Sequence, residues 1–329
     1  MSKNNKETIK ISEICSSYKQ VTNPIKEDLQ NSFSNDIKLK PKTKHKTVNW
    51  FIIGASSIGK SHISVNQPCQ DYHTYSFLKE GWGISVVSDG AGSAENSHLG
   101  SKFVCEEIVK IFKDFYSQKK IFSNNRLPNE AEWQSISNDL FKKAFESLVL
   151  FAHDKNIELS SVACTVIVVI FTPIGLLTSH IGDGRAGYCN SSGEWKPLLT
   201  PHKGEEANQT IFITSLSWIS NVDFRMSNVL VPESKVINEK AIAFTLMTDG
   251  CETHAFNCSK IDERTMKWMD PNIPSEIFFN PLLNQLKSMF NKKVPIDDIN
   301  NNWKEFIEEG TIGLKEEPDD KSLILGILV

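Results

Sequence analysis

The sequence reads Val86-Val87-Ser88-Asp89-Gly90 at one point, Ser179-His180-Ile181-Gly182-Asp183-Gly184 at a second and Thr245-Leu246-Met247-Thr248-Asp249-Gly250 at a third. Each stretch is a strand-forming run that ends in Asp-Gly. A further acidic pair, Asp319-Asp320, directly precedes the last apolar run of the chain. Asp-Gly alone is typical of a turn. Four acidic strand ends in one chain exceed what turns require, and they predict a site built from carboxylates.

The chemistry of such a site follows from its oxygen atoms. Hard cations such as Mg²⁺ and Mn²⁺ prefer carboxylate and carbonyl oxygens together with water. An aspartate at the end of a strand is held by a rigid element, and the glycine after it lets a carbonyl or a substrate approach closely. The pattern therefore predicts a divalent-metal site.

Apolar segments around these motifs indicate the fold class. We expect strands at residues 48–55, 83–88, 161–171, 174–181, 186–190, 226–231, 241–247 and 322–328. We expect helices at residues 97–116, 130–155, 275–290 and 299–309, where apolar residues recur at helical spacing. Runs of strands broken by paired helices, without strict alternation, predict an α+β domain with packed sheets flanked by helices.

Composition excludes several other classes of protein. The chain has 329 residues, of which 40% are hydrophobic, so it can bury a large core. Its net charge of −4 argues against a nucleic-acid partner. No apolar run follows the N-terminal methionine, and residues 164–177 are too short and too polar to span a membrane. The seven cysteines form no CxxC pair, which indicates reduced thiols, and we expect a cytoplasmic protein without membrane contact.

The two ends of the chain differ in composition. Residues 1–46 are rich in Lys, Asn and Ser, and we interpret them as a flexible basic N-terminal arm. The arm is either a solvated tail or a docking segment for an acidic partner or a kinase. Residues 47–329 are expected to form one catalytic domain.

Six segments occur in order between residue 50 and the end of the chain, at residues 61–71, 88–94, 182–187, 204–214, 248–252 and 319–322. Together they resemble the motifs of the PP2C-like, metal-dependent serine/threonine protein phosphatases, in particular the bacterial branch. The resemblance implies a four-layer αββα sandwich, in which two mostly antiparallel sheets are flanked by helices. It also implies a dinuclear metal site at one end and a flap at about residues 200–235 that meets the substrate.

The resemblance also implies roles for individual residues. Asp89 would bridge two divalent metals, with the Gly90 carbonyl as a further ligand. Asp249 and Asp319 would hold one metal, and Asp71 would bind waters of the second. On this basis Asp71, Asp89 and Asp249 are the expected catalytic residues.

A third, weaker metal would lie at Asp183, with Glu252 nearby. The implied reaction is hydrolysis of phosphoserine or phosphothreonine by a water activated between two Mn²⁺ or Mg²⁺ ions. The implied partners are a phosphorylated protein substrate and a cognate serine/threonine kinase.

Two positions depart from the better-known branch of the family. Asn66 stands where relatives carry a phosphate-binding Arg, and Ala91 stands where they often carry a His after the second Asp-Gly. Lys60, His62 or Arg185 are our candidates for binding the phosphate instead. These departures leave open a catalytically weak pseudophosphatase that binds phosphoproteins as a regulatory module.

A rival motif, Gly54-Ala55-Ser56-Ser57-Ile58-Gly59-Lys60-Ser61, satisfies the GxxxxGK[ST] pattern of a P-loop. A P-loop must open a helix whose N-terminus receives phosphates. The residues that follow, 62–68, are β-branched and broken by a proline, so we expect no helix there. An NTPase is therefore the weaker alternative.

Overall fold

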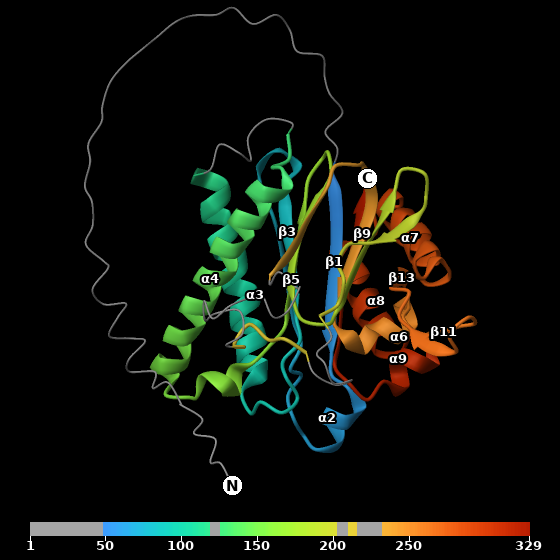
Figure 1. Ribbon diagram of the computed structural model, residues 1–329. Coiled ribbons are helices and arrows are strands. Elements are labelled where there is room, and N and C mark those ends of the chain that lie inside the picture. Colours follow the sequence, from blue (N-terminus) through green and yellow to red (C-terminus); the bar gives the residue numbers. More distant parts are fainter. Residues whose placement is uncertain (1–48, 119–125, 203–209, 216–231) are drawn as a thin grey trace, which may run out of the picture. The chain divides into compact units, whose positions relative to one another are not determined.

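The computed structural model describes residues 49–118, 126–202, 210–215 and 232–329. These residues form four layers, with two β-sheets in the middle and helices on both outer faces (Figure 1). The predicted four-layer αββα sandwich is therefore confirmed. The predicted arm, the strand expected at residues 226–231 and most of the predicted flap lie outside the described residues.

Each central sheet has five strands. The first sheet has the order β1 (Trp50–Ser57), β14 (Lys321–Leu328), β9 (Ala241–Met247), β6 (Arg185–Asn190) and β7 (Trp195–Pro197). The second has the order β2 (Tyr72–Phe77), β3 (Gly83–Ser88), β4 (Val166–Phe171), β5 (Leu176–Ile181) and β8 (Glu233–Ile237). All pairings between these ten strands are antiparallel.

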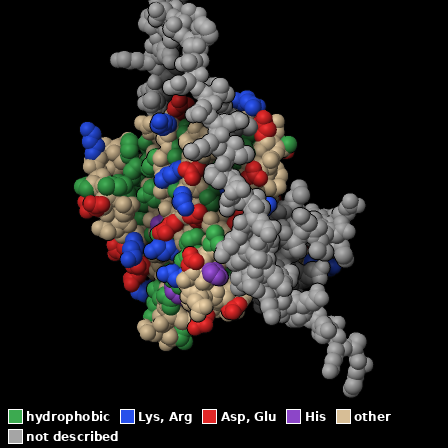
Figure 2. Space-filling model, turned by 90° about the vertical axis from the view of Figure 1, so that its left-hand side faces the viewer, with side chains coloured by type: hydrophobic (Ala, Val, Ile, Leu, Met, Phe, Trp, Pro, Cys, Tyr) green, Lys and Arg blue, Asp and Glu red, His purple; other side chains and the backbone are tan. Residues whose placement is uncertain are grey.

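Long helices cover the outer face of each sheet. Helices α3 (Ser97–Gln118) and α4 (Glu130–Lys155) pack on the second sheet, and α7 (Glu276–Asn291) and α8 (Ile296–Glu309) pack on the first (Figure 1). On the visible part of the face formed by α3 and α4, acidic and basic side chains are interspersed (Figure 2). Lys110 and Glu107 form one such pair on α3. This outward face is therefore a solvated surface of mixed charge.

Strand β4 is apolar along its whole length because both of its faces are buried. Side chains alternate along a strand, so Val166, Val168 and Ile170 join the core beneath α3 and α4. The alternating residues Ile167, Val169 and Phe171 face the other sheet. There Phe171 stacks on Phe244 with ring centroids 5.5 Å apart. The space between the sheets is thus a packed aromatic and aliphatic core.

Smaller elements complete the described part of the fold. They are the helices α2 (Lys60–Ser64), α6 (Glu252–Ala255) and α9 (Ile312–Glu316), and the ribbons β10 (Phe256–Asn257) with β13 (Ile273–Pro274) and β11 (Lys260–Asp262) with β12 (Lys267–Met269). None of the helices in the described part of the chain combines the length and apolar composition that a membrane span requires.

Several elements differ from the sequence-based expectation. The strand expected from residue 161 begins only at Val166, because Leu159–Val162 form a short 3₁₀ helix. Strands β2, β7 and β8 were not predicted, and β8 begins inside the predicted flap. A one-turn helix, α2, forms where we expected none. It buries no side chain, so local hydrogen bonds of the backbone overcome the β-branched composition.

Candidate metal centre

The antiparallel register brings several strand ends to one end of the sandwich. It pairs the start of β2 with the end of β3, and the start of β4 with the end of β5. In the other sheet it pairs the start of β6 with the end of β9, and the start of β14 with the end of β1. The short turn between β5 and β6 joins the two sheets at this same end. Acidic residues far apart in the sequence therefore meet.

Three of the predicted aspartates form the centre of this site. Asp89 follows β3, Asp183 lies in the turn between β5 and β6, and Asp249 follows β9. One carboxylate oxygen from each lies within 4.8 Å of the others. The backbone of Asp89 is fixed by Thr165, whose hydroxyl accepts from the Asp89 N–H at 3.0 Å and whose N–H donates to the Asp89 carbonyl at 2.8 Å.

Asp71 extends the cluster from the residue before β2. Its side chain is only 5% exposed. One carboxylate oxygen, Oδ2, accepts a hydrogen bond of 2.6 Å from the hydroxyl of Thr248. The other, Oδ1, is buried and has no hydrogen-bond partner. An unsatisfied buried anion is costly, so this oxygen is well suited to a water or cation inside the site.

The titration behaviour of these groups reflects burial and mutual repulsion. Burial, followed by the charges of Asp71 and Asp249, raises the pKa of Asp89 well above its usual value. Burial raises the pKa of Asp71 as well, although the Thr248 hydrogen bond opposes that shift. Burial and the charges of Asp183 and Asp319 raise the pKa of Asp249 to about 7. A divalent cation among these oxygens would favour their ionised forms, so the donor set fits the predicted metals.

The Asp319-Asp320 pair divides into two different roles. Asp319 is exposed at the site, whereas the Asp320 side chain is buried. The Asp320 carboxylate accepts from the Gly59 N–H at 2.6 Å and the Gln70 N–H at 2.5 Å, and it lies 2.9 Å from His62 Nδ1. Asp320 therefore ties together the segments before β2 and after β1, which leaves Asp319 as the member that can face a metal.

The predicted phosphate-binding residues have different surroundings. His62 is held against Asp320, and Lys60 pairs on the surface with Glu316. Arg185 is fully buried at the start of β6. Among the three, Lys60 is the residue whose charge is exposed to solvent.

The buried guanidinium of Arg185 does not fit the predicted role in phosphate binding. Its Nε donates to Glu252 at 2.8 Å, and its terminal nitrogens donate to Asp270 and Asn272 at 2.8 Å each. Further contacts join it to Asp270 at 3.2 Å and to Glu252 at 2.8 Å. All five N–H donors of an arginine are then used inside the protein. Arg185 instead positions Glu252, which was predicted to lie near a third metal.

The P-loop alternative is wrong for this chain. Its first four residues lie within β1, which pairs antiparallel with β14, so the pattern does not follow a strand of a parallel sheet. The backbone N–H groups of Gly59, Lys60 and Ser61, which would bind phosphates in a P-loop, donate to Asp320 and to the carbonyls of Glu317 and Pro318. No phosphate cradle forms at these three residues.

Sequence reasoning missed the two threonines that position the aspartates. Thr248 binds Asp71 and also accepts from the Ser322 N–H at 2.9 Å, so it joins three segments. The position of Thr248 directly before Asp249 could have indicated its role from the sequence. Nothing in the sequence indicated the role of Thr165, because its contact with Asp89 depends on the pairing of distant segments.

Comparisons with known proteins agree with this geometry. The family model described as protein phosphatase 2C matches residues 58–291. Serine/threonine-protein phosphatase 3 of Escherichia coli (strain K12) is 27% identical over 284 residues, which cover 85% of this chain and 99% of that protein. The chain belongs to the protein phosphatase 2C family, and it is a metal-dependent protein phosphatase.

Solved structures show the same fold at low sequence identity. The phosphatase Stp1 from Staphylococcus aureus has a TM-score of 0.51 at 12% identity, and the match covers 88% of this chain and 100% of that one. The S. agalactiae serine/threonine phosphatase has a TM-score of 0.51 at 12% identity, and the match covers 85% of this chain and 100% of that one. The arrangement of sheets and helices is therefore shared with bacterial phosphatases.

Proposed function

We propose that this chain hydrolyses phosphoserine and phosphothreonine residues of protein substrates, with Mn²⁺ or Mg²⁺ at the acidic end of the sandwich. The observation that carries the proposal is the convergence of Asp89, Asp183 and Asp249 within 4.8 Å of one another. The name of the Escherichia coli relative supports the choice of serine and threonine. A cognate kinase would supply the phosphorylated substrate.

Each aspartate has a proposed task in this reaction. Asp89, with the Gly90 carbonyl, is the proposed bridge between two cations, and Asp249 and Asp319 would complete the first ion. Asp71 would orient the water ligands of the second through Oδ1, the oxygen that has no protein partner. Bound divalent cations lower the pKa of a water and screen the charge of the phosphate.

Two further acidic residues contribute to the proposed site. Asp183 lies in the cluster, and Glu252, held by Arg185, adds negative charge near Asp249. This is where we place a third, weaker metal. Lys60 is the proposed contact for the substrate phosphate, since its exposed pair with Glu316 is readily exchanged for another anion.

A covalent thiol mechanism has no support at this site. Cys251 lies two residues after Asp249 and is fully buried. Burial, together with the nearby charge of Asp71, raises the pKa of its thiol, so the nucleophilic thiolate is disfavoured. A pseudophosphatase would have lost metal-binding groups, whereas every predicted ligand position is acidic here apart from the Gly90 carbonyl. Attack by water is the proposed chemistry.

The proposal is tested by hydrolysis of a phosphothreonine peptide with Mn²⁺ and with EDTA. We expect phosphate release only with metal, and Asp89→Asn should lower the rate by ~100-fold or more, because it removes the proposed bridging ligand. Asp154→Asn is the matched control, since the Asp154 side chain is 81% exposed and remote in sequence from the cluster motifs. Full activity of Asp89→Asn in a folded protein would refute the assigned site.

A further inference from the structure

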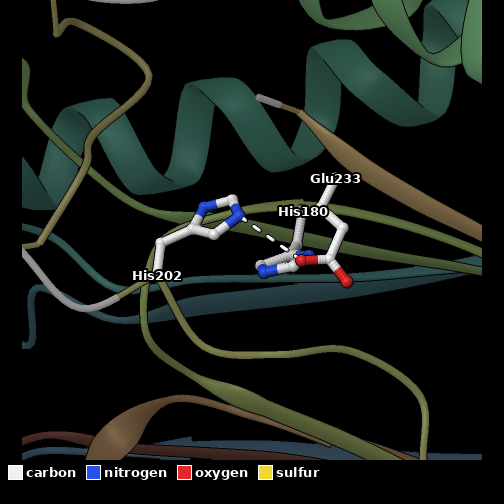
Figure 3. Close-up of side chains that lie close together, drawn as sticks. All are labelled: His180, His202 and Glu233. Atoms are coloured by element: carbon white, nitrogen blue, oxygen red, sulfur yellow. Dashed lines mark ion pairs between the residues drawn. The ribbon is translucent and has the colours of Figure 1, made fainter. Parts of the chain in front are cut away.

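A second cluster of metal-binding side chains lies beside β5 and β8. His180 belongs to β5, His202 follows β7, and Glu233 begins β8. One donor atom from each of these three residues lies within 4.8 Å of the others. Figure 3 shows both imidazole rings and the carboxylate pointing toward one another. This cluster shares no residue with the acidic centre.

His180 already presents a free lone pair. The side chain is 1% exposed, and Nε2 donates a hydrogen bond of 2.9 Å to the Thr200 carbonyl. A neutral imidazole that donates through Nε2 carries its lone pair on Nδ1. That Nδ1 is buried and has no hydrogen-bond partner. Metal-bound histidines commonly have this arrangement, in which one nitrogen is fixed by a carbonyl and the other binds the ion.

His202 and Glu233 complete the set. His202 is 5% exposed, and its Nε2 lies 3.8 Å from Glu233 Oε2, too far for a good hydrogen bond. Burial lowers the pKa of both imidazoles, so both histidines remain neutral at physiological pH, as metal ligation requires. Glu233 also pairs with Lys235 through Oε1 at 3.0 Å, which leaves Oε2 facing the histidines.

We infer that His180, His202 and Glu233 form a second metal site, distinct from the catalytic one, that binds Zn²⁺. Two imidazoles and one carboxylate are a donor set that suits Zn²⁺, with a fourth position left for water. The acidic centre offers only oxygen donors and suits Mg²⁺ or Mn²⁺. The two clusters therefore select different ions by ligand chemistry.

Binding requires one adjustment, at His202. The rings of His180 and His202 stack with centroids 4.2 Å apart and planes 24° apart, so an ion in the plane of one ring lies off the plane of the other. His202 must turn and carry its hydrogen on Nδ1. It then gives up its contact with the Gly182 N–H, which is long at 3.3 Å. His180 needs no such change.

The position of the site indicates what the ion does. His202 and Glu233 stand on either side of the connection formed by residues 203–232, and His180 lies on strand β5, which pairs with β8. An ion bound to all three would fix both ends of that connection to the second sheet. The proposed role of Zn²⁺ is structural, at the base of the segment that the sequence predicts as a flap.

The test uses Co²⁺ as a spectroscopic probe for Zn²⁺ in the full-length double variant Asp89→Asn/Asp249→Asn, in which two of the three clustered aspartates of the acidic centre are replaced. We expect one saturable equivalent of Co²⁺ with visible absorption, displaced by Zn²⁺. His202→Gln or Glu233→Gln should weaken binding by ~10-fold or more, because each removes a ligand. Lys235→Ala should tighten it, because that change removes the cation paired with Glu233.

Matched controls are His153→Gln and Glu194→Gln, since both side chains are more than half exposed and neither belongs to the cluster. They should leave Co²⁺ affinity unchanged. Absence of saturable binding, or binding that His202→Gln and Glu233→Gln do not weaken, would overturn the inference. If circular dichroism shows that a ligand variant does not fold, the Lys235→Ala variant provides the test. An unchanged Co²⁺ affinity in Lys235→Ala would then refute the site.

Discussion

Neighbouring carboxylates at residues 319 and 320 have different tasks, and this difference can be measured. Asp320→Ala would leave the N–H groups of Gly59 and Gln70 buried without acceptors. We expect it to lower the free energy of unfolding by about 3 kcal/mol, measured by urea denaturation with Mn²⁺ at saturation. Glu308→Gln, which removes an exposed pair with Lys304, should cost less than about 1 kcal/mol. Equal effects of the two substitutions would refute the structural role of Asp320.

For individual residues, the sequence predicted which carboxylates lie close together, but not which side chains position the residues of the site. Asp89, Asp183 and Asp249 were predicted as neighbours, and the structure brings them together. Their role as metal ligands stays a prediction. The partners of Arg185 could not be predicted, because Asp270 lies 85 positions away and reaches it only through tertiary folding. A phosphate-binding role was the natural interpretation of an arginine beside an Asp-Gly motif, but the internal hydrogen bonds of Arg185 do not fit it.

At the scale of elements, the connection between β1 and α2 has to pass close to the metal site. A Cβ atom added at Gly59 would lie 2.3 Å from the backbone carbon of Asp319. Gly59→Ala should therefore displace Asp319 and weaken Mn²⁺ binding by ~10-fold, measured by calorimetry. Gly92→Ala is the control, because its nearest neighbour would be Gln70 Oε1 at 4.0 Å. Equal Mn²⁺ affinity in both variants would contradict this account.

Elements with strong local signals were predicted well. Helix α4 has the predicted bounds, because apolar residues recur at helical spacing along it; the structure adds a capping box of Asn129 and Glu132 at its start. Strand β2 was missed, since it lies at the edge of its sheet and its residues are only partly buried, without a clear alternation. Helix α2 was missed because one turn of backbone hydrogen bonds outweighs side-chain preference.

For the whole molecule, the acidic centre links stability to pH and to metal. Burial and neighbouring charges raise the pKa of Asp249 to about 7 in the folded, metal-free protein. The folded state then holds a proton that the unfolded state releases near pH 4, so this group's stabilisation is lost as pH rises toward 7. In EDTA, Asp249→Asn should gain a stability advantage over the unchanged protein that grows between pH 5 and pH 7.

Thermal unfolding of the two proteins at each pH measures this difference, and the contributions of titrating groups outside the acidic centre cancel in it. Saturating Mn²⁺ should reverse the order, because the unchanged protein gains binding energy that Asp249→Asn has lost. An advantage that shrinks as pH rises would contradict the assigned origin of the pKa shift.

At this scale the resemblance predicted the four-layer architecture correctly, whereas the strand order within each sheet could not be read from local patterns.

The pairing of β1 with β14 has a consequence for synthesis. Strand β1 lies at the edge of its sheet, and in the described part of the chain β14 is its only neighbour there, with Trp50 opposite Leu328. A nascent chain must therefore carry this apolar strand unpaired until translation has passed residue 321. Asp319 also arrives only then. Ribosome-bound intermediates of this phosphatase are thus expected to be inactive and to depend on chaperones until the last strand emerges.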